Sequence, residues 1–262
     1  LLSQMTLDEK AGTMFFSMIS MKKDGSISEK PALSDPFSFI VAGTSKMVFM
    51  KHINHFNILF GTGSREMATW NNNIQKLAEK TRLGIPVTIG TDPRNHFSDN
   101  PLASALAGEF SQFPEPLGLA AIGDSLTVAE FADIARQEYL AAGIRVALQP
   151  QIDLATEPRW GRMNSTFGED AHLTVQLTGA YIKGFQGDSM GVNSVACMTK
   201  HFPGGGPQKE GIDPHFKVQK GQVYPGHHFD YHLLPFEAAF KAGTAEIMPY
   251  YGVPIGQTKE DI

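Results

Sequence analysis

Short apolar segments alternate with amphipathic helical patterns along this chain, and that alternation restricts the folds open to it. The apolar segments contain β-branched residues and lack a strict polar–apolar alternation, which is typical of strands buried on both faces of a parallel sheet. Five such strands are predicted, at residues 52–60, 85–90, 144–148, 195–198 and 245–248. Repeated strand–helix units of this kind predict an α/β fold.

The helical patterns carry recognisable start and stop signals. Thr6 and Glu9 fit a capping box at the start of the first helix. The apolar face of that helix is predicted to comprise Leu7, Ala11, Met14 and Phe15, which recur at helical spacing. Further helices are predicted at residues 66–81, 125–142, 170–186 and 233–242, each with apolar residues on one face.

The composition is that of a globular protein and excludes several classes of partner. The hydrophobic fraction is 42%, and the formal net charge of −5 arises from mixed signs, with no basic footprint for nucleic acid. No apolar run approaches the ~20 residues needed to span a bilayer, so we expect neither nucleic acid nor a membrane as partner. The lone Cys197 is expected to be a buried small hydrophobe. Because the chain starts at Leu1 without a signal-peptide pattern, we expect a processed, trimmed or incomplete start.

The stretch VACMTKHFPGGGP, residues 195–207, carries the clearest functional signal. Its apolar strand ends at Lys200 and His201, and a turn rich in proline and glycine follows. The carboxyl ends of parallel strands open into a crevice where ligands bind. Lysine and histidine supply hydrogen-bond donors there, and glycines allow close backbone approach. Taken alone, the same pattern also fits a loop in which Lys200 only caps a turn.

Three further segments accompany this stretch in a fixed order. They are IPVTIGTDPRNHF at residues 85–97, IRVALQPQIDLATEPRWGRMNSTFGED at 144–170 and AEIMPYYG at 245–252. PRWGR followed by FGED and then KHFPG is a specific combination, and nearly the whole chain resembles the barrel of glycoside hydrolase family 3. That family comprises β-glucosidases, β-xylosidases and related exo-acting enzymes. The resemblance implies a (β/α)8 TIM-barrel-like fold in one N-terminal domain over residues 1–262, incomplete here with about five of its eight βα units.

The resemblance also implies a sugar-binding site made of Asp92, Arg162, Lys200, His201 and Tyr251. Asp92 matches an aspartate that grips two hydroxyls of the terminal sugar, and Lys200 and His201 are expected to donate to sugar hydroxyls. Arg162 matches an arginine that reaches the sugar, and Tyr251 a tyrosine that lines the pocket. We expect the five side chains to converge at the carboxyl ends of adjacent strands, with cis Lys200-His201 and Phe202-Pro203 bonds. One sugar contact of the family is in doubt, because many relatives carry glutamate where this chain has Ser165.

Retaining glycosidases need two carboxyl groups about 5–5.5 Å apart. In the family, the nucleophile is an aspartate in a Ser-Asp-Trp-like motif beyond the strand ending at Tyr251, and the acid/base glutamate lies in a second domain. Neither is found in this sequence, so no catalytic residue is identified. Asp213 and His215 match an Asp-x-His pair that some members use as general acid/base. We therefore expect a truncated, split or incompletely supplied glycosidase, inactive alone, with the rest of the barrel and the second domain in the same or another chain.

The function predicted is part of a retaining exo-acting β-glycosidase for terminal non-reducing β-linked glucose or xylose, without cofactor or metal. One alternative is a sugar-binding pseudoenzyme that kept the pocket without the chemistry. A weaker one is an unrelated βα enzyme using phosphate or a metal, but the glycine run lacks the P-loop ending, and the histidines lack a compact ligand pattern. Four of the nine histidines fall in residues 208–232, the histidine-rich segment, which is expected to be a loop over the pocket. The compartment stays open, with a periplasmic or secreted location favoured over a cytoplasmic one.

Overall fold

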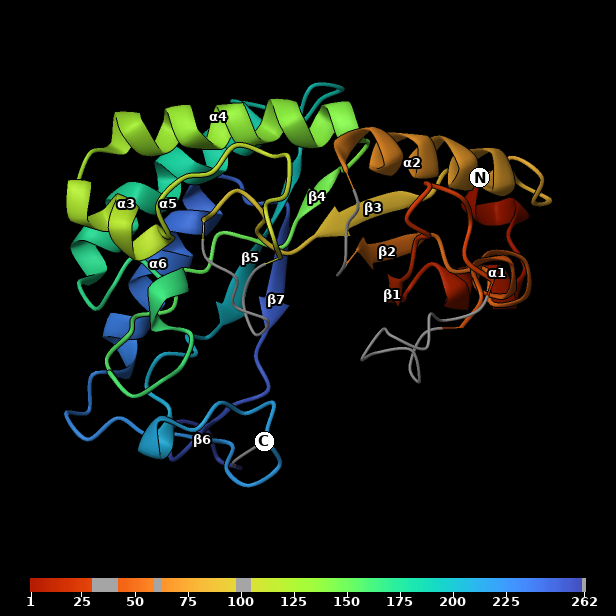
Figure 1. The fold of residues 1–262 in the computed structure, drawn as a ribbon. Coiled ribbons are helices and arrows are strands. Elements are labelled where there is room, and N and C mark those ends of the chain that lie inside the picture. Colours follow the sequence, from red (N-terminus) through yellow and green to blue (C-terminus); the bar gives the residue numbers. More distant parts are fainter. Residues whose placement is uncertain (30–41, 59–62, 98–104, 261–262) are drawn as a thin grey trace.

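Six parallel strands form one curved sheet in the computed structural model, which describes residues 1–29, 42–58, 63–97 and 105–260 (Figure 1). The strand order is β1-β2-β3-β4-β5-β7, so successive βα units place each strand beside the previous one. The strands are β1 Phe16–Ile19, β2 His55–Ile58, β3 Thr88–Thr91, β4 Val146–Ala147, β5 Ala196–Phe202 and β7 Glu246–Pro249. Such an all-parallel arc is part of the wall of a (β/α)8 barrel.

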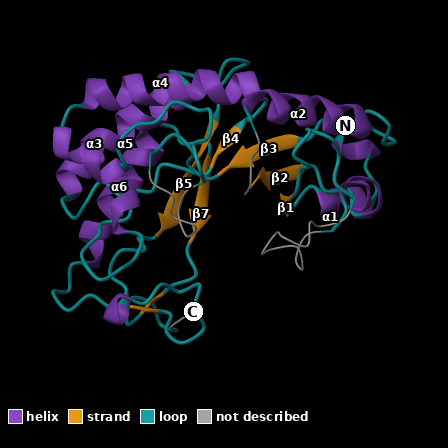
Figure 2. Cartoon of the chain, in the orientation of Figure 1, coloured by secondary structure: helices purple, strands orange, loops and turns teal. Residues whose placement is uncertain are grey.

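Helices lie along the outer side of this arc (Figure 2). They are α1 Leu7–Gly12, α2 Ser64–Ala78, α3 Pro116–Ile122, α4 Ser125–Ala142, α5 Ala171–Gln186 and α6 Phe229–Lys241. Short 3-10 turns occur at Leu2–Gln4, Met163–Ser165 and Lys209–Gly211, and a π-helical turn at Lys46–Met50. Two further short strands, β6 Gly221–Gln222 and β8 Val253–Pro254, pair with each other outside the main sheet.

The helix ends follow from the residues found there. Thr6 and Glu9 form the predicted capping box of α1. Asp124 caps α4 by accepting from the backbone N–H groups of Leu126 and Thr127, and Gly143 ends the helix in the left-handed region at φ 84°. Because glycine has no Cβ, it adopts that conformation without steric cost.

The core between the sheet and the helices combines aliphatic side chains with a group of large aromatic ones. Trp70 of α2, Phe131 of α4 and Phe185 of α5 are almost completely buried. The rings of Phe131 and Tyr181 lie 5.5 Å apart, and those of Tyr139 and Phe185 lie 5.7 Å apart. Burying one such side chain stabilises the fold by about 1.5–3 kcal/mol. This packing fixes the strands, and with them the residues at their ends.

The structure corrects the prediction of five strands to six. The strand that the sequence missed is β1 Phe16–Ile19. The apolar spacing continues past Gly12 through Met14 and Phe15, which extended the predicted helix, but α1 ends at Gly12 and both side chains are exposed. α3 was also not predicted, and α6 begins at Phe229, earlier than expected. The predicted strand at 52–60 begins at His55, and its last two residues lie outside the described part of the chain.

Within the described part of the chain, no helix has both the length and the apolar character that a membrane span requires.

Candidate functional site

The carboxyl ends of β3, β4 and β5 bring several charged side chains to one edge of the sheet. Asp92 directly follows β3, and Asp153 lies in the loop after β4. Lys200 and His201 were predicted to follow their strand, but β5 continues to Phe202 and includes both. The pairing register of β5 with β7 shifts between Lys200 and Phe202. The predicted cis Lys200-His201 and Phe202-Pro203 bonds are both present, as is a cis Gln149-Pro150 bond that was not predicted.

Asp92 and Lys200 form an ion pair at this edge. Lys200 Nζ lies 2.8 Å from Asp92 Oδ1, and Asn57 Nδ2 of β2 donates to Asp92 Oδ2 at 3.1 Å. Burial opposes ionisation of Asp92, yet the charge and hydrogen bond of Lys200 hold its pKa below the ordinary value. Burial lowers the pKa of Lys200, and Asp92 counteracts this. The side chain of Lys200 is 2% exposed and that of Asp92 22%, so solvent reaches the pair from the aspartate side.

Asp153 fixes the orientation of His201. Its carboxylate is fully buried and accepts from His201 Nδ1 at 2.8 Å, from the His201 backbone N–H at 3.1 Å and from the Gly205 backbone N–H. Burial, followed by the nearby Arg162 charge, lowers the pKa of His201 to about 3. The ring is therefore neutral at neutral pH, with its proton assigned to Nδ1 by the bond to Asp153. Nε2 is then an acceptor, and the donation from His201 to a sugar hydroxyl that the sequence led us to expect would require a proton on Nε2.

Arg162 and Gln151 contribute buried donors to the same region. Arg162 Nη2 donates to Gln151 Oε1 at 3.2 Å, and both side chains are almost completely buried. Arg162 Nε and Gln151 Nε2 have no hydrogen-bond partner among the described residues. Leaving a buried donor unpaired costs about 1–3 kcal/mol, so such groups usually meet a ligand or ordered water. The region therefore offers unused donors next to the acceptors of Asp92 and His201.

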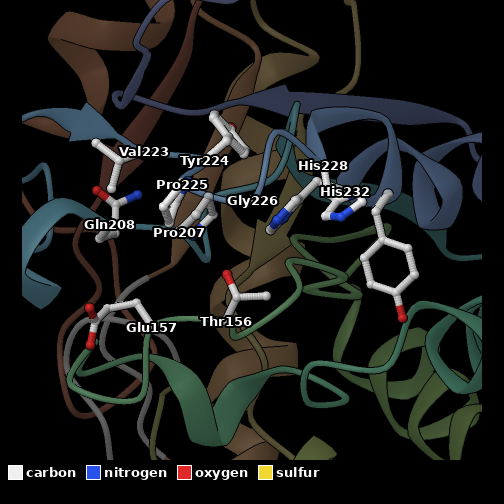
Figure 3. Close-up of a pocket in the computed structure, with 11 residues that line it drawn as sticks. Thr156, Glu157, Pro207, Gln208, Val223, Tyr224, Pro225, Gly226, His228 and His232 are labelled. Carbon is white, nitrogen blue, oxygen red and sulfur yellow. The ribbon is translucent and has the colours of Figure 1, made fainter.

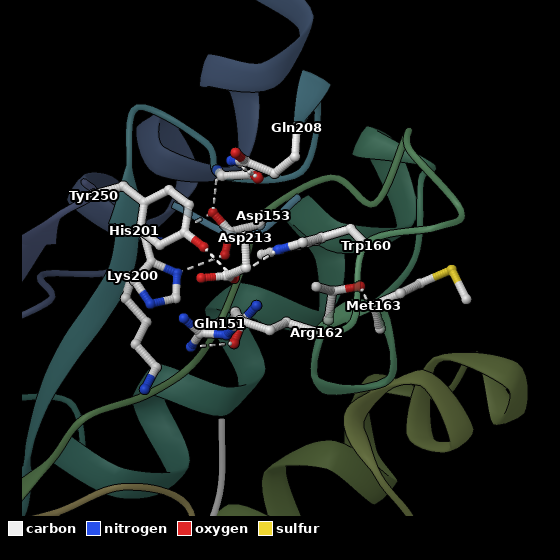
Figure 4. Close-up of polar contacts among 12 residues, drawn as sticks. Gln151, Asp153, Trp160, Arg162, Met163, Lys200, His201, Gln208, Asp213 and Tyr250 are labelled. Atoms are coloured by element: carbon white, nitrogen blue, oxygen red, sulfur yellow. Dashed lines mark hydrogen bonds and ion pairs between the residues drawn. The ribbon is translucent and has the colours of Figure 1, made fainter. Parts of the chain in front are cut away.

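Asp213 joins three parts of the site (Figure 4). Its Oδ2 accepts from Trp160 Nε1 at 2.9 Å and from the Tyr250 hydroxyl at 2.8 Å, and its Oδ1 lies 2.5 Å from His215 Nδ1. Burial would raise the pKa of Asp213, but these bonds, led by that of His215, hold it well below its usual range. The predicted Asp213–His215 pair is thus formed, with His215 partly exposed.

Four of the five predicted site residues lie together. Lys200 contacts Asp92 directly, His201 is its neighbour in β5, and the charge of Arg162 acts on the pKa of all three. We call Asp92, Arg162, Lys200, His201 and Asp153 the strand-end cluster. Tyr251 is not brought into it, because its side chain is 59% exposed and its ring packs edge-on against His215 at 4.9 Å.

The tyrosine that reaches the cluster is Tyr250. Its ring lies 4.4 Å from that of His201, and Arg162 Cζ lies 5.9 Å above it. The sequence analysis also missed Asn57, Gln151 and Asp153. Asp153 had a usable signal, since it is an acidic residue between two apolar ones just after a strand.

The glycine run has a structural explanation. A Cβ on Gly205 would lie 2.6 Å from the Tyr250 ring, and one on Gly206 would collide with the backbone carbonyl of Leu154. Only glycine fits at these two positions. The described residues also contain no group of three or more histidine, cysteine or acidic side chains placed to hold a metal ion.

Comparison with known proteins agrees with this geometry. The model of the glycosyl hydrolase family 3 N-terminal domain matches residues 42–253. Beta-glucosidase C of Emericella nidulans is 51% identical over 264 residues, which cover 100% of this chain and 41% of that protein. A periplasmic beta-glucosidase/beta-xylosidase of Dickeya chrysanthemi is 44% identical over 97% of this chain and 38% of its own length. The chain thus spans about two fifths of these relatives.

The fold comparison points the same way. The crystal structure of a Listeria innocua beta-glucosidase in complex with glucose superposes with a TM-score of 0.69 at 24% identity, covering 97% of this chain and 32% of that one. At that identity the likeness establishes the fold, which is the barrel domain predicted from the sequence. The domain match and the relatives together show that this chain belongs to glycoside hydrolase family 3.

Proposed function

We propose that this chain supplies the sugar-binding part of a retaining exo-acting β-glycosidase that hydrolyses terminal non-reducing β-linked glucose or xylose. The observation that carries the proposal is the strand-end cluster, where partly exposed Asp92 pairs with buried Lys200 beside neutral His201 and the unpaired donor of Arg162. The names of the Emericella and Dickeya relatives support the choice of a β-glucoside or β-xyloside. A periplasmic or secreted location is part of the proposal, supported by the name of the Dickeya relative.

The cluster suits a neutral ligand with several adjacent hydroxyls. Asp92 is the acceptor for two of them, because its carboxylate is partly exposed and has lone pairs beyond those used by Lys200 and Asn57. Lys200 Nζ and Arg162 Nε donate, and His201 Nε2 accepts. Tyr251 remains a predicted contact at the outer edge of the strand-end cluster, where its exposed ring would meet an entering sugar.

The two catalytic carboxyl groups are proposed to come from outside residues 1–262. Asp153 is fully buried and occupied by three donors, and Asp213 likewise accepts from three side chains. A nucleophile must instead face the anomeric carbon with a free oxygen. The rest of the barrel and a second domain, in the same or another chain, would supply the pair, which fits the share of its relatives that this chain covers.

A second candidate for the proton donor is the Asp213–His215 pair. The 2.5 Å contact between His215 Nδ1 and Asp213 Oδ1 favours it, because a buried carboxylate that accepts from Nδ1 orients the ring and leaves Nε2 to exchange a proton with the substrate. In this alternative His215 protonates the leaving group, and only the nucleophile comes from elsewhere.

The test uses the full-length protein that carries this chain and measures hydrolysis of aryl β-glucosides and β-xylosides. Asp92→Asn weakens two charge-assisted bonds of about 1.5–3 kcal/mol each, so kcat/KM falls by roughly 10²–10⁴-fold. Asp133→Asn is the matched control, because Asp133 pairs with Arg136 on the surface of α4. The double variant Asp92→Asn/Lys200→Met removes both charges of the ion pair together, so that neither partner is left without the other, and guards against misfolding. Unchanged kcat/KM in the folded double variant would overturn the proposal, and sugar binding without turnover in the wild type would favour the pseudoenzyme.

A further inference from the structure

A cavity of about 500 Å³ lies beside the strand-end cluster, between the loop after β4 and the histidine-rich segment. Its lining includes Thr156 on one side and Gln208, Val223, Tyr224 and His232 on the other (Figure 3). We call it the side pocket. Binding pockets for small molecules typically measure roughly 300–1,000 Å³, so this one holds a single sugar-sized ring.

Backbone pairing between neighbouring segments holds the walls of the side pocket in place. β6 pairs with β8, and Gln208 forms an antiparallel bridge with Gln222 of β6. The backbone N–H of Val223 donates to the Pro207 carbonyl at 2.9 Å. These bonds hold the histidine-rich segment against the turn that follows β5, and the cavity forms behind that turn.

Two buried polar atoms of the lining lack partners. Gln208 is 1% exposed and His232 6%. Gln208 Nε2 donates to the Gly205 carbonyl, which identifies Oε1 as its unused acceptor. His232 Nδ1 has no partner among the described residues either. Both atoms belong to residues that line the side pocket, and buried polar atoms without a partner usually meet a ligand or ordered water.

The lining selects the chemistry of that ligand. Burial lowers the pKa of His232 to about 4, so its ring is neutral at neutral pH. Glu157 at the rim is paired with Arg159 at 2.7 Å, which leaves no free charge there to attract an ion. Tyr224, packed edge-on against His232 at 5.2 Å, adds an aromatic surface to the apolar walls. A neutral ring with hydroxyl groups and an apolar face fits these walls, as pyranoses do.

We propose that the side pocket is a second carbohydrate-binding site, separate from the strand-end cluster, for one neutral pyranose ring. The choice of a sugar over other neutral hydroxylated rings rests on the proposed function. The two sites are linked by hydrogen bonds from Gln208 through Gly205 to Asp153, which also holds His201. The pyranose is either a free sugar or a further unit of an oligosaccharide whose end lies in the cluster.

The test measures binding of methyl 1-thio-β-glucoside, a hydrolysis-resistant analogue, to the full-length protein by saturation-transfer NMR and equilibrium dialysis. Wild type is expected to bind two molecules per chain, and Asp92→Asn one. Val223→Phe fills the side pocket and should raise the Kd of this remaining site at least tenfold in the Asp92→Asn background. Val218→Phe is the matched control, because Val218 lies in the same segment, is 85% exposed and is not part of the lining. Thr156→Phe fills the pocket from its exposed opposite wall and replaces Val223→Phe if that variant does not fold.

Each result has a defined meaning. Binding abolished by Asp92→Asn, or unaffected by both pocket-filling variants, would overturn the second site. The second site would be upheld and the proposed function refuted by one combination of results. In it, binding survives Asp92→Asn and is lost when the pocket is filled, while Asp92→Asn leaves turnover unchanged. A hydrolysis-resistant β-thio-linked tetrasaccharide separates the two sources: if it bridges the sites, it binds at least tenfold more tightly than methyl 1-thio-β-glucoside, and either single-site variant removes this gain. If the sites act separately, no such gain is seen.

Discussion

Protonation of His201 upon unfolding should lower the free energy of unfolding as the pH falls from 7 to 5. The pKa of His201 is about 3 in the folded protein, against 6.5 for the ordinary side chain. The unfolded state therefore binds more protons than the folded state below pH 6.5, and stability is lost as the pH falls from 6.5 towards 3. pH 5 lies 1.5 units below 6.5. At ~1.4 kcal/mol per unit, the free energy of unfolding is therefore lower at pH 5 by about 2 kcal/mol.

The assay is urea unfolding of the full-length protein at pH 5 and pH 7, together with an NMR titration of the His201 ring. His201→Gln alone is a poor comparison, because buried Asp153 would lose its partner and its own pKa would rise. The double variant His201→Gln/Asp153→Asn removes both titrations, and its stability should change by about 2 kcal/mol less between the two pH values. His172→Gln, on the exposed face of α5, controls for the loss of one histidine.

Other buried histidines do not confound this comparison. Burial also lowers the pKa values of His55, His96 and His232, so the wild type loses stability at low pH by more than His201 alone explains. These residues are unchanged in the variants, and their effect cancels in the difference. A His201 ring that titrates near pH 6.5, or equal pH dependence in wild type and double variant, would refute the reasoning.

Three further predictions follow from particular contacts. Gly206→Ala should lower the free energy of unfolding in urea by at least ~3 kcal/mol, because the added Cβ would overlap a backbone carbonyl. The control Gly161→Ala adds its Cβ in open space and should change the free energy of unfolding by less than about 1 kcal/mol. Tyr250→Phe should cost about 1–3 kcal/mol through its lost bond to buried Asp213, against less than about 0.5 kcal/mol for exposed Tyr251→Phe. The isolated 1–262 chain should not hydrolyse aryl β-glucosides or β-xylosides, and turnover abolished by an aspartate substitution within it would contradict the proposed origin of the carboxylates.

The convergence of the cluster was predictable because it depends on sheet topology. In a parallel sheet every strand ends at the same edge, so charged residues that follow buried strands meet whatever their separation in sequence. Asp92 and Lys200 are 108 positions apart and are nonetheless hydrogen-bonded at 2.8 Å. The family-specific order of the segments then identified which strand-end residues to combine.

Side-chain direction beyond a strand was not predictable in the same way. β7 ends at Pro249, and the turn that follows decides whether Tyr250 or Tyr251 faces the cluster. Tyr250 faces it because its ring packs on His201 and its hydroxyl reaches Asp213. Both partners come from other segments, so neither contact is visible in the local sequence. The same holds for Asp153, whose function depends on β5 lying beside it.

Asp213 is best understood from the origin of its three donors. Trp160 belongs to the loop after β4, Tyr250 to the turn after β7, and His215 to the histidine-rich segment. A carboxylate held ionised by such bonds fixes three loops relative to one another, whether or not it also supports proton transfer. Loss of activity in Asp213→Asn would therefore not distinguish the two roles. His215 distinguishes them, because it is the partly exposed member, and its removal leaves the bonds of Trp160 and Tyr250 to Asp213 in place.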